Sequence, residues 1–255
     1  MSVQANAPYN IIFPGGKTAK ALYVSKTVSP TEVIERLSLT IPTAAIFLTG
    51  GAGLMSDSDL RLTEQFITVL AQFAQEQGAT VVDGGTESGI MQMMGQARAL
   101  HSLTFPLIGV APLSKVEYPG YLNSAKEADL NPDHTHFVFV DGDNWGDESE
   151  LILGLTRTLA AHMQPGQKPA LGILINGGSV SRKEVYLAAT KELHLPMIII
   201  EGSGRAADEI ATVMKTGRTS KRILQAILAG GDIQLVATSQ GPGALRTMLE
   251  SKFKR

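Results

Sequence analysis

Residues 78–100, GATVVDGGTESGIMQMMGQARAL, combine a short strand, a glycine turn and a helix in an order that can bind an anion. The apolar run 79–82 predicts a buried strand, and the pair Gly84–Gly85 allows a sharp backbone turn. From Ser88, which with Thr86 is a candidate helix cap, apolar residues recur with helical spacing. The free N–H groups and positive dipole end of such a helix favour a phosphate or carboxylate at the turn.

The same arrangement occurs at three other places in the chain. Strands are predicted at 44–49, 171–175 and 198–200, and each runs into a glycine-rich turn. Any one turn taken alone is equally compatible with a purely structural connection. Parallel strands, however, place such turns along one edge of the sheet, where ligands bind in α/β proteins. The backbone N–H groups expected to hold phosphates are those of Gly51, Ala52, Gly85, Thr86, Gly177 and Gly178.

The remaining elements complete an α/β pattern around these turns. We predict a Rossmann-like, mostly parallel sheet with helices on both faces. Residues 1–11 are expected to form a flexible arm, 12–215 the ligand-binding domain, and 216–255 a C-terminal helical extension packed on that domain. Residues 111–133 are irregular and proline-containing, which is typical of a functional or mobile loop. Further strands are predicted at 21–25, 107–110, 136–140 and 233–237, and helices at 30–39, 57–78, 148–163, 181–193, 205–215, 219–229 and 243–254.

Composition excludes several classes of protein. The 255 residues are 44% hydrophobic, which is enough for one large α/β domain. The formal net charge of −2 argues against a protein that binds nucleic acid or a membrane surface. The absence of cysteine excludes disulfides and thiolate zinc sites, and it is compatible with the cytoplasmic location that we expect. No secretory signal pattern is present, and no apolar run approaches the ~20 residues that span a bilayer.

Better-known nucleotide and metal motifs do not match. Gly16-Lys17-Thr18 lacks the leading glycine of a P-loop, and a dinucleotide fingerprint fails because Thr86 replaces its second glycine. Asp141 and Asp143 begin like a calcium loop, but the later positions lack the required ligands. We therefore expect neither a metal nor a resident cofactor. The acidic residues 141–150 are typical of a solvated loop with helix-capping carboxylates, with a ribose contact or a weak magnesium site as the alternatives.

At the turns 49–53 and 84–91, the sequence resembles the cytoplasmic nucleotide-sensing domain at the N-terminus of melastatin-type transient receptor potential channels. More broadly, it is similar to the SLOG superfamily of Rossmann-like nucleotide binders. The resemblance covers about residues 12–215 and implies a phosphorylated nucleoside such as ADP-ribose as ligand, in a free-standing, prokaryotic-style form without an attached channel. Further matching segments are IGVAP at 108–112, DLNPDHTHFVFVD at 129–141 and EGSGRAAD at 201–208.

An enzymatic branch of the superfamily is the alternative. Phosphoribohydrolases that release cytokinin bases carry GGGxxGLMG and PGGxGTxxE motifs, which residues 84–91 and 176–184 resemble. This resemblance places Glu184 at the position of the catalytic acid. Three residues of the second segment depart from the motif, and residues 115–135 contain no arginine to match the family's catalytic arginine. Because a glycosidase stabilises charge on both the base and the ribose, these departures favour binding over turnover.

Arg205 stands where a cation is unexpected, in the first turn of a predicted helix. One explanation is an ion pair with Asp208 or Glu209 one turn later. The other is that Arg205 and the helix N-terminus together face an anionic ligand. The two explanations predict opposite effects of removing Arg205, on stability in the first case and on affinity in the second.

The sequence thus predicts a nucleotide-binding sensor, with a nucleotide N-glycosidase using Glu184 as the alternative. The expected partner is a small-molecule nucleotide, with no nucleic acid or membrane, and the sequence allows a homo-oligomer. Candidates for contacts with ribose hydroxyls are Thr49, Asp141 and Glu184. The full set of candidate ligand-binding residues is Thr49, Gly50, Gly51, Ala52, Gly53, Gly84, Gly85, Thr86, Gly89, Pro112, Asp141, Asn176, Gly177, Gly178, Ser179, Glu201, Gly202, Ser203, Gly204 and Arg205.

Overall fold

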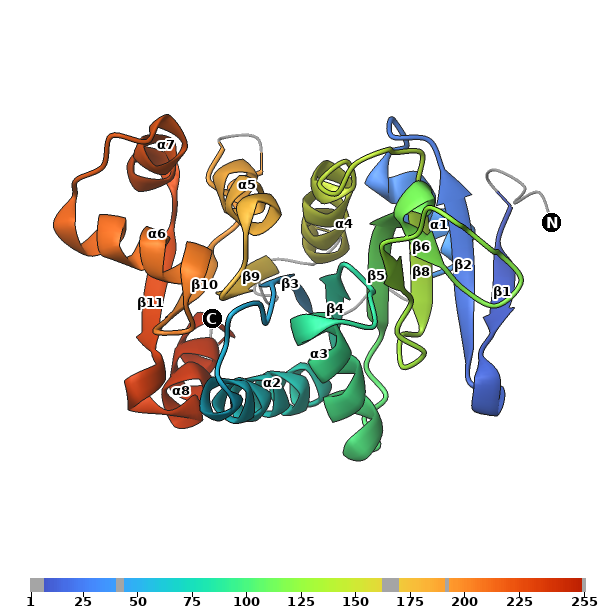
Figure 1. Cartoon of the computed structure of the whole chain (residues 1–255), viewed down its shortest axis with the longest axis horizontal. Helices are drawn as coiled ribbons and strands as arrows, with labels where there is room; N and C mark the ends of the chain where they lie inside the picture. Colours follow the sequence, from blue (N-terminus) through green and yellow to red (C-terminus); the bar gives the residue numbers. More distant parts are fainter. Residues whose placement is uncertain (1–6, 40–43, 162–169, 191–192, 254–255) are drawn as a thin grey trace.

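The computed structural model describes residues 7–39, 44–161, 170–190 and 193–253. In these residues nine strands form one sheet in the order β1-β2-β8-β5-β4-β3-β9-β10-β11 (Figure 1), and every neighbouring pair is parallel except β1 with β2. Helices cover both faces, so the predicted α/β, Rossmann-like fold is confirmed. The strands are β1 (Tyr9–Ile12), β2 (Thr18–Val24), β3 (Ala44–Gly50), β4 (Ala79–Asp83), β5 (Leu107–Pro112), β8 (His136–Val140), β9 (Ala170–Ile175), β10 (Met197–Glu201) and β11 (Ile233–Ala237).

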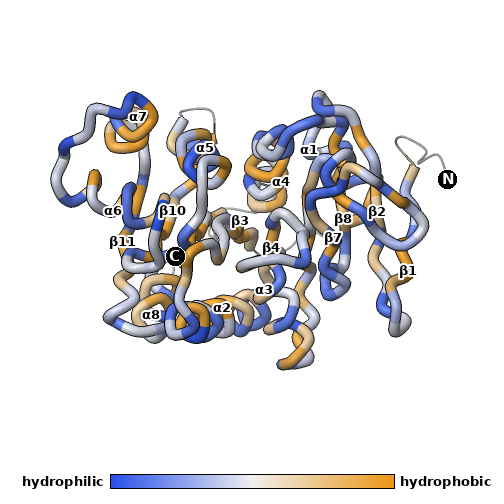
Figure 2. Tube along the Cα trace, in the orientation of Figure 1, coloured by the Kyte–Doolittle hydropathy of each residue, from blue (hydrophilic) through white to orange (hydrophobic). Residues whose placement is uncertain are grey.

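Two layers of helices enclose the sheet, one on each face (Figure 1). The strands carry apolar residues along their length, whereas the helices mix apolar and hydrophilic residues (Figure 2), as expected for helices that bury one side. On one face lie α1 (Pro30–Leu37), α4 (Ser149–Ala161), α5 (Ser179–Ala188), α6 (Arg205–Thr216) and α7 (Arg222–Gly230), and on the other lie α2 (Asp57–Gln77), α3 (Gly89–Leu100) and α8 (Pro242–Phe253).

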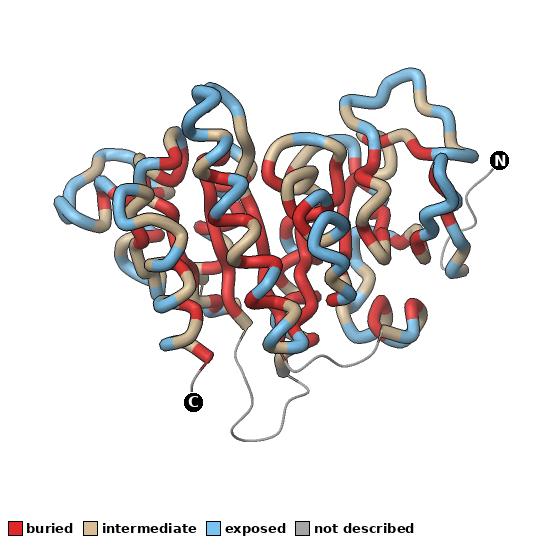
Figure 3. Tube along the Cα trace, turned by 90° about the horizontal axis from the view of Figure 1, so that it is seen from below, coloured by how far each residue is buried: buried red, intermediate tan, exposed pale blue. Residues whose placement is uncertain are grey.

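Strand β3 shows how the core is divided between the two layers. Ala45 and Phe47 join the core that contains α1, α4 and α5, while Ile46 and Leu48 join the core that contains α2, α3 and α8. Successive side chains of a strand point to opposite faces, so a strand covered on both sides is apolar throughout. Figure 3 shows the resulting band of buried residues through the centre of the molecule.

Local signals fix the long helix α2. The Ser56 side chain accepts the Asp59 N–H and the Asp59 carboxylate accepts the Ser56 N–H, which together form a capping box. Gly78 ends the helix with φ +61°, the left-handed conformation common at helix ends. The helix predicted from residue 57 to residue 78 is therefore confirmed.

The order of the strands reverses direction next to β3. From β3 the chain continues to its neighbour β4 and then β5, but β9, on the other side of β3, leads to β10 and β11. This switch point makes β4, β3, β9 and β10 consecutive parallel strands, and they are the four strands predicted to end in glycine turns. The four turns therefore share one edge of the sheet, as predicted, and ligands bind at such switch points.

The two ends of the chain differ from the expected division. Residues 9–11, placed in a flexible arm, belong to β1, which pairs with β2; residues 1–6 lie outside the described residues. The C-terminal extension includes the predicted strand at 233–237, and this strand, β11, extends the main sheet beside β10. Its helix α8 packs on α2, where the Phe253 and Phe73 rings meet edge to face at 5.0 Å. None of the helices in the described ranges is both long and apolar enough to cross a membrane.

Residues 113–131 contain only short elements, in agreement with their irregular sequence. A 3-10 turn, Leu113–Lys115, is followed by β6 (Val116–Glu117) and β7 (Ala128–Asp129), which pair with each other and form a separate two-stranded sheet. A further bridge joins Thr86 to Leu130. This segment therefore lies against the glycine turn that follows β4.

Candidate functional site

A cavity of about 300 Å³ opens at the carboxyl ends of β3 and β4, next to the switch point. Five of the predicted site residues line it, namely Thr49, Gly50, Gly84, Thr86 and Glu184. Its walls combine hydroxyl groups, two buried carboxyl groups and apolar side chains. The remaining lining residues are Phe47, Leu48, Ser88, Met91, Glu127, Ala128, Trp145, Glu148, Ile152, Val180 and Ser181.

Two helices begin at this cavity without a side-chain cap. Ser88 is the N-cap of α3 and Gly178 the N-cap of α5, and neither cap makes a side-chain hydrogen bond. The expected capping by Thr86 or Ser88 does not occur, because their hydroxyls contact each other instead, at 3.0 Å. The first-turn N–H groups of both helices, together with the positive dipole ends, are therefore directed to the cavity side of the sheet.

Two of the predicted phosphate-binding amides are already engaged within the protein. The Gly51 N–H donates to the Ile175 carbonyl at 3.1 Å, and the Gly85 N–H donates to Asp83 Oδ1 at 2.8 Å. These two hydrogen bonds hold the turns in place. Contacts of the Ala52 and Thr86 amides and of the neighbouring 177–178 amides with a ligand stay predictions.

The turns after β9 and β10 are joined by hydrogen bonds centred on Asn176. Its buried side-chain amide donates to the Ser203 carbonyl at 2.8 Å and to the Gly53 carbonyl at 3.2 Å. The Ala206 and Ala207 N–H groups donate to the Gly177 and Asn176 carbonyls. Amides in the first turn of α6 are thus used to join the two turns, rather than being open to an anion.

Arg205 crosses the space between two glycine turns. A Cβ built on Gly53 would lie 2.8 Å from Arg205 Nη1, and one on Gly178 would lie 3.1 Å from Nη2. The guanidinium therefore lies against both turns, at the N-cap of α5. Its backbone has φ +49°, which is uncommon for a residue other than glycine and costs of order 1–3 kcal/mol.

The acidic residues that could neutralise Arg205 have other partners. The Asp208 carboxylate accepts the Gly202 N–H at 2.6 Å, and the Glu209 carboxylate pairs with Arg182 at 2.9 Å and with Lys221. Within the described ranges no carboxylate forms an ion pair with Arg205. The structural explanation for this residue, an ion pair on its own helix, is therefore not what the structure shows.

Glu184 and Glu148 are buried carboxyl groups on the cavity wall. The Thr49 hydroxyl donates to Glu184 Oε2, and the Ser149 hydroxyl donates to Glu184 Oε1 at 3.2 Å. The Gly146 N–H donates to Glu148 Oε2 at 2.8 Å. Burial raises the pKa of each carboxyl to about 7, and the proximity of Glu148 adds to the rise at Glu184.

This burial predicts how stability depends on pH. The Glu184 carboxyl has an ordinary pKa of 4.5 and a pKa of about 7 in the folded protein, so the folded state holds the proton more tightly than the unfolded chain. Its contribution is complete below about pH 4.5 and is lost as pH rises to about 7, on the order of 3 kcal/mol. We expect Glu184→Gln to reduce the loss of unfolding free energy between pH 5 and pH 8, measured by urea denaturation. An unchanged pH dependence in this variant would contradict the assignment.

Other predicted residues lie away from the cavity lining. Asp141 is exposed at the end of β8, and Pro112 ends β5. Glu201, at the end of β10, pairs with Lys215 in the last turn of α6. In the acidic segment, Asp147 accepts the Asp143 and Asn144 N–H groups and pairs with Lys26. Asp141 and Asp143 are exposed, as expected for a solvated loop, but Glu148 of the same segment is buried on the cavity wall.

The sequence reasoning missed Trp145 and Glu148 as cavity residues. Trp145 is the single tryptophan of the chain, and its indole N–H donates to Glu127 Oε2 at 2.7 Å. Lys115 in turn pairs with Glu127 at 2.6 Å. The only sequence signal was a large aromatic residue inside a polar loop, which suggests a ligand or a packing contact without choosing between them.

These features define a Rossmann-like α/β protein, with a cavity at the switch point of a parallel sheet between glycine turns and helix N-termini. The chain belongs to the family described as "SLOG in TRPM, prokaryote", whose match covers residues 43–246. This confirms the resemblance to the SLOG superfamily and to melastatin-type channels that the sequence analysis described.

Several known proteins that it resembles are cation channels. The chain is 27% identical to transient receptor potential cation channel subfamily M member 2 of Rattus norvegicus over 241 residues, which cover 80% of this chain and 16% of the channel. It is 27% identical to subfamily M member 7 of Homo sapiens, covering 81% of this chain and 13% of the channel. For the Drosophila melanogaster channel trpm, the identity is 29%, with 80% and 12% covered. The chain therefore spans less than a fifth of the length of these relatives.

Proposed function

We propose that this protein binds a phosphorylated nucleoside such as ADP-ribose, as a sensor that does not turn its ligand over. The observation that carries this proposal is that the uncapped N-terminus of α5 and the Arg205 guanidinium meet at Gly178, beside the cavity. No carboxylate among the described residues forms an ion pair with this guanidinium. A helix N-terminus and an arginine both favour the same negative charge. A phosphate group meets both requirements.

The cavity also offers room for the other parts of a nucleotide. Trp145, Met91 and Val180 form an apolar part of the wall that suits a base. The hydroxyl of Thr49 and the carboxyls of Glu148 and Glu184 suit ribose hydroxyls. The hydrogen bond from the Trp145 indole to Glu127 fixes the tryptophan before the ligand binds, which reduces the entropy lost on binding.

A nucleotide N-glycosidase is the second candidate, because Glu184 and Glu148 line the cavity with pKa values near neutrality. Against turnover, both oxygens of Glu184 already accept hydroxyl donors, from Thr49 and Ser149. The lining in the described part of the chain also contains no arginine or lysine to stabilise a departing base. These contacts favour binding of a nucleotide over its turnover.

The single tryptophan gives a direct test of the proposed function. Titration with ADP-ribose, AMP and adenosine, followed by Trp145 fluorescence and calorimetry, should show at least tenfold weaker binding of adenosine because it lacks phosphate. The same mixtures, analysed by chromatography, should contain no free base above background. Equal affinity for adenosine and AMP would contradict the phosphate assignment. Base release that Glu184→Gln stops would establish the glycosidase instead.

A further inference from the structure

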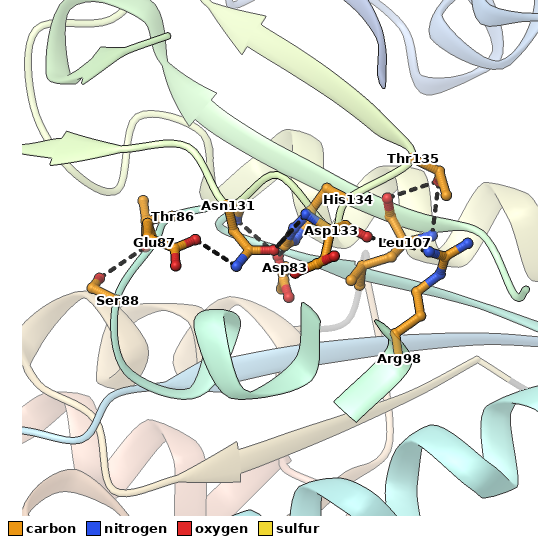
Figure 4. Close-up of polar contacts among 11 residues, drawn as sticks. Asp83, Thr86, Glu87, Ser88, Arg98, Leu107, Asn131, Asp133, His134 and Thr135 are labelled. Carbon is orange, nitrogen blue, oxygen red and sulfur yellow. Dashed lines mark hydrogen bonds and ion pairs between the residues drawn. The ribbon is translucent and has the colours of Figure 1, made fainter. Parts of the chain in front are cut away.

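A network of hydrogen bonds, most of them buried, lies next to the glycine turn that follows β4 (Figure 4). Asp83 Oδ1 accepts the Gly85 N–H at 2.8 Å and contacts His134 Nε2 at 2.9 Å. His134 Nδ1 lies 3.0 Å from Asn131 Oδ1, and the Asn131 amide donates to Glu87 Oε2 at 2.6 Å. The Asp83 and His134 side chains have no exposed surface.

The hydrogen-bond partners of Asn131 fix the orientation of its amide and the role of His134 Nδ1. Asn131 Oδ1 accepts the Asp133 N–H at 3.0 Å, and its amide nitrogen donates to Glu87, so the amide orientation is determined. His134 Nδ1 therefore donates to that oxygen. Asp83 Oδ1 accepts an amide proton from Gly85 and lies 2.9 Å from His134 Nε2. Both ring nitrogens of His134 thus face oxygen atoms of buried or half-buried side chains.

This hydrogen-bond network holds the glycine turn that forms part of the cavity wall. Gly84 and Thr86 line the cavity. Both backbone polar groups of Gly85, which lies between them, form hydrogen bonds. Its N–H reaches Asp83, and its carbonyl accepts the Asn131 N–H at 3.0 Å. The His134 ring stacks at 5.4 Å on the Phe137 ring, which fixes its plane. His134 therefore connects the irregular segment 129–134 to the turn at Gly84–Thr86, which forms part of the cavity wall.

We propose that His134 is a positioning residue for the ligand: it sets the turn Gly84–Ser88 through Asp83 and so determines how tightly the cavity holds a phosphorylated nucleoside. The inference rests on the proposed function for its ligand, but not for the contacts of the histidine with the turn. None of the residues in this hydrogen-bond network lines the cavity, so His134 acts only through the turn. A preorganised supporting residue of this kind affects affinity through the geometry of the residues that it holds.

Two substitutions separate the two ring nitrogens. A glutamine side chain can place its amide nitrogen near Nε2 and donate to Asp83, whereas an asparagine reaches only the Nδ1 position near Asn131. Both remove the buried imidazole ring and its contact with Phe137, so we expect similar losses of stability in urea unfolding. We expect His134→Gln to keep ADP-ribose affinity within about threefold of the wild type and His134→Asn to lose three- to tenfold, each measured by calorimetry at a temperature where the protein is folded.

Nuclear magnetic resonance tests the same inference without a ligand. In the wild-type protein the Gly85 amide should exchange slowly with solvent, because it donates to the buried Asp83 carboxyl. Gly85 exchange should stay slow in His134→Gln and become faster in His134→Asn. Equal affinity and equal exchange in the two variants would overturn the positioning role. If the wild type binds no nucleotide while these resonance signatures hold, the proposed function fails and the positioning of the turn stands.

Discussion

Replacing Gly85 by alanine is expected to destabilise the native state by about 3 kcal/mol or more. Gly85 has φ +70°, a conformation that costs a residue with a Cβ about 1–2 kcal/mol. A Cβ there would also lie 2.8 Å from the Gly109 Cα and 2.9 Å from a ring carbon of Phe137. Overpacking of this kind adds about 1–3 kcal/mol, because the Gly109 backbone cannot move aside without disturbing β5. Urea unfolding at neutral pH measures the loss.

Gly217→Ala is the matched control for this prediction. Gly217 has nearly the same conformation, φ +66°, but a Cβ there would meet nothing within 4 Å. Its loss should therefore be only the conformational cost, about 1 kcal/mol. Similar losses in the two variants would show that the close approach of Gly85 to Gly109 is not a constraint on the fold.

This result also bears on what the sequence could predict about the glycine turn. The pair Gly84–Gly85 was interpreted as room for a phosphate to approach the backbone. In the structure, the room at Gly85 is filled by Gly109 and Phe137, and its amide is used by Asp83. The need for glycine was predicted correctly, but its cause comes from a strand 24 residues later, which local pattern does not identify.

The strands were the most predictable part of the fold. β8 and β11 begin and end at the predicted residues, 136–140 and 233–237. β8, like the other central parallel strands, is covered on both faces, so it is a continuous apolar run with distinct ends. Helix ends were less predictable: α5 begins at Ser179 rather than residue 181, because its N-cap is a glycine and no capping side chain marks it.

The candidate site was predictable only where it follows strand ends. Thr49, Gly50 and Gly84 follow from the rule that parallel strands align their carboxyl ends, and they line the cavity. Glu148 and Trp145 come from a polar loop, and their approach to α5 depends on how α4 packs beside it. The pairing of His134 with Asp83 joins residues 51 positions apart. No spacing in the sequence predicts contacts of that kind.

Arg205→Ala is expected to lower affinity for ADP-ribose by about ten- to a hundredfold while leaving stability unchanged. Loss of a charge-assisted hydrogen bond costs about 1.5–3 kcal/mol of binding free energy. The native state loses little, because no carboxylate among the described residues pairs with this guanidinium and the strained backbone conformation remains with alanine. Calorimetric titration beside a urea unfolding curve of the free protein measures both quantities.

Arg182→Ala provides the control, since Arg182 is already paired with Glu209 at 2.9 Å. Its removal should cost at most about 1 kcal/mol of stability, as for other partly exposed ion pairs, and should change affinity less than threefold. The two variants should therefore have opposite effects: Arg205→Ala changes binding, whereas Arg182→Ala changes only stability. Raising the salt concentration should weaken ADP-ribose binding to the wild type more than to Arg205→Ala, because only the wild type presents this charge to the phosphate. An unaltered dissociation constant in Arg205→Ala would remove Arg205 from the site, and the phosphate would then have only the N-termini of α3 and α5 as its partners.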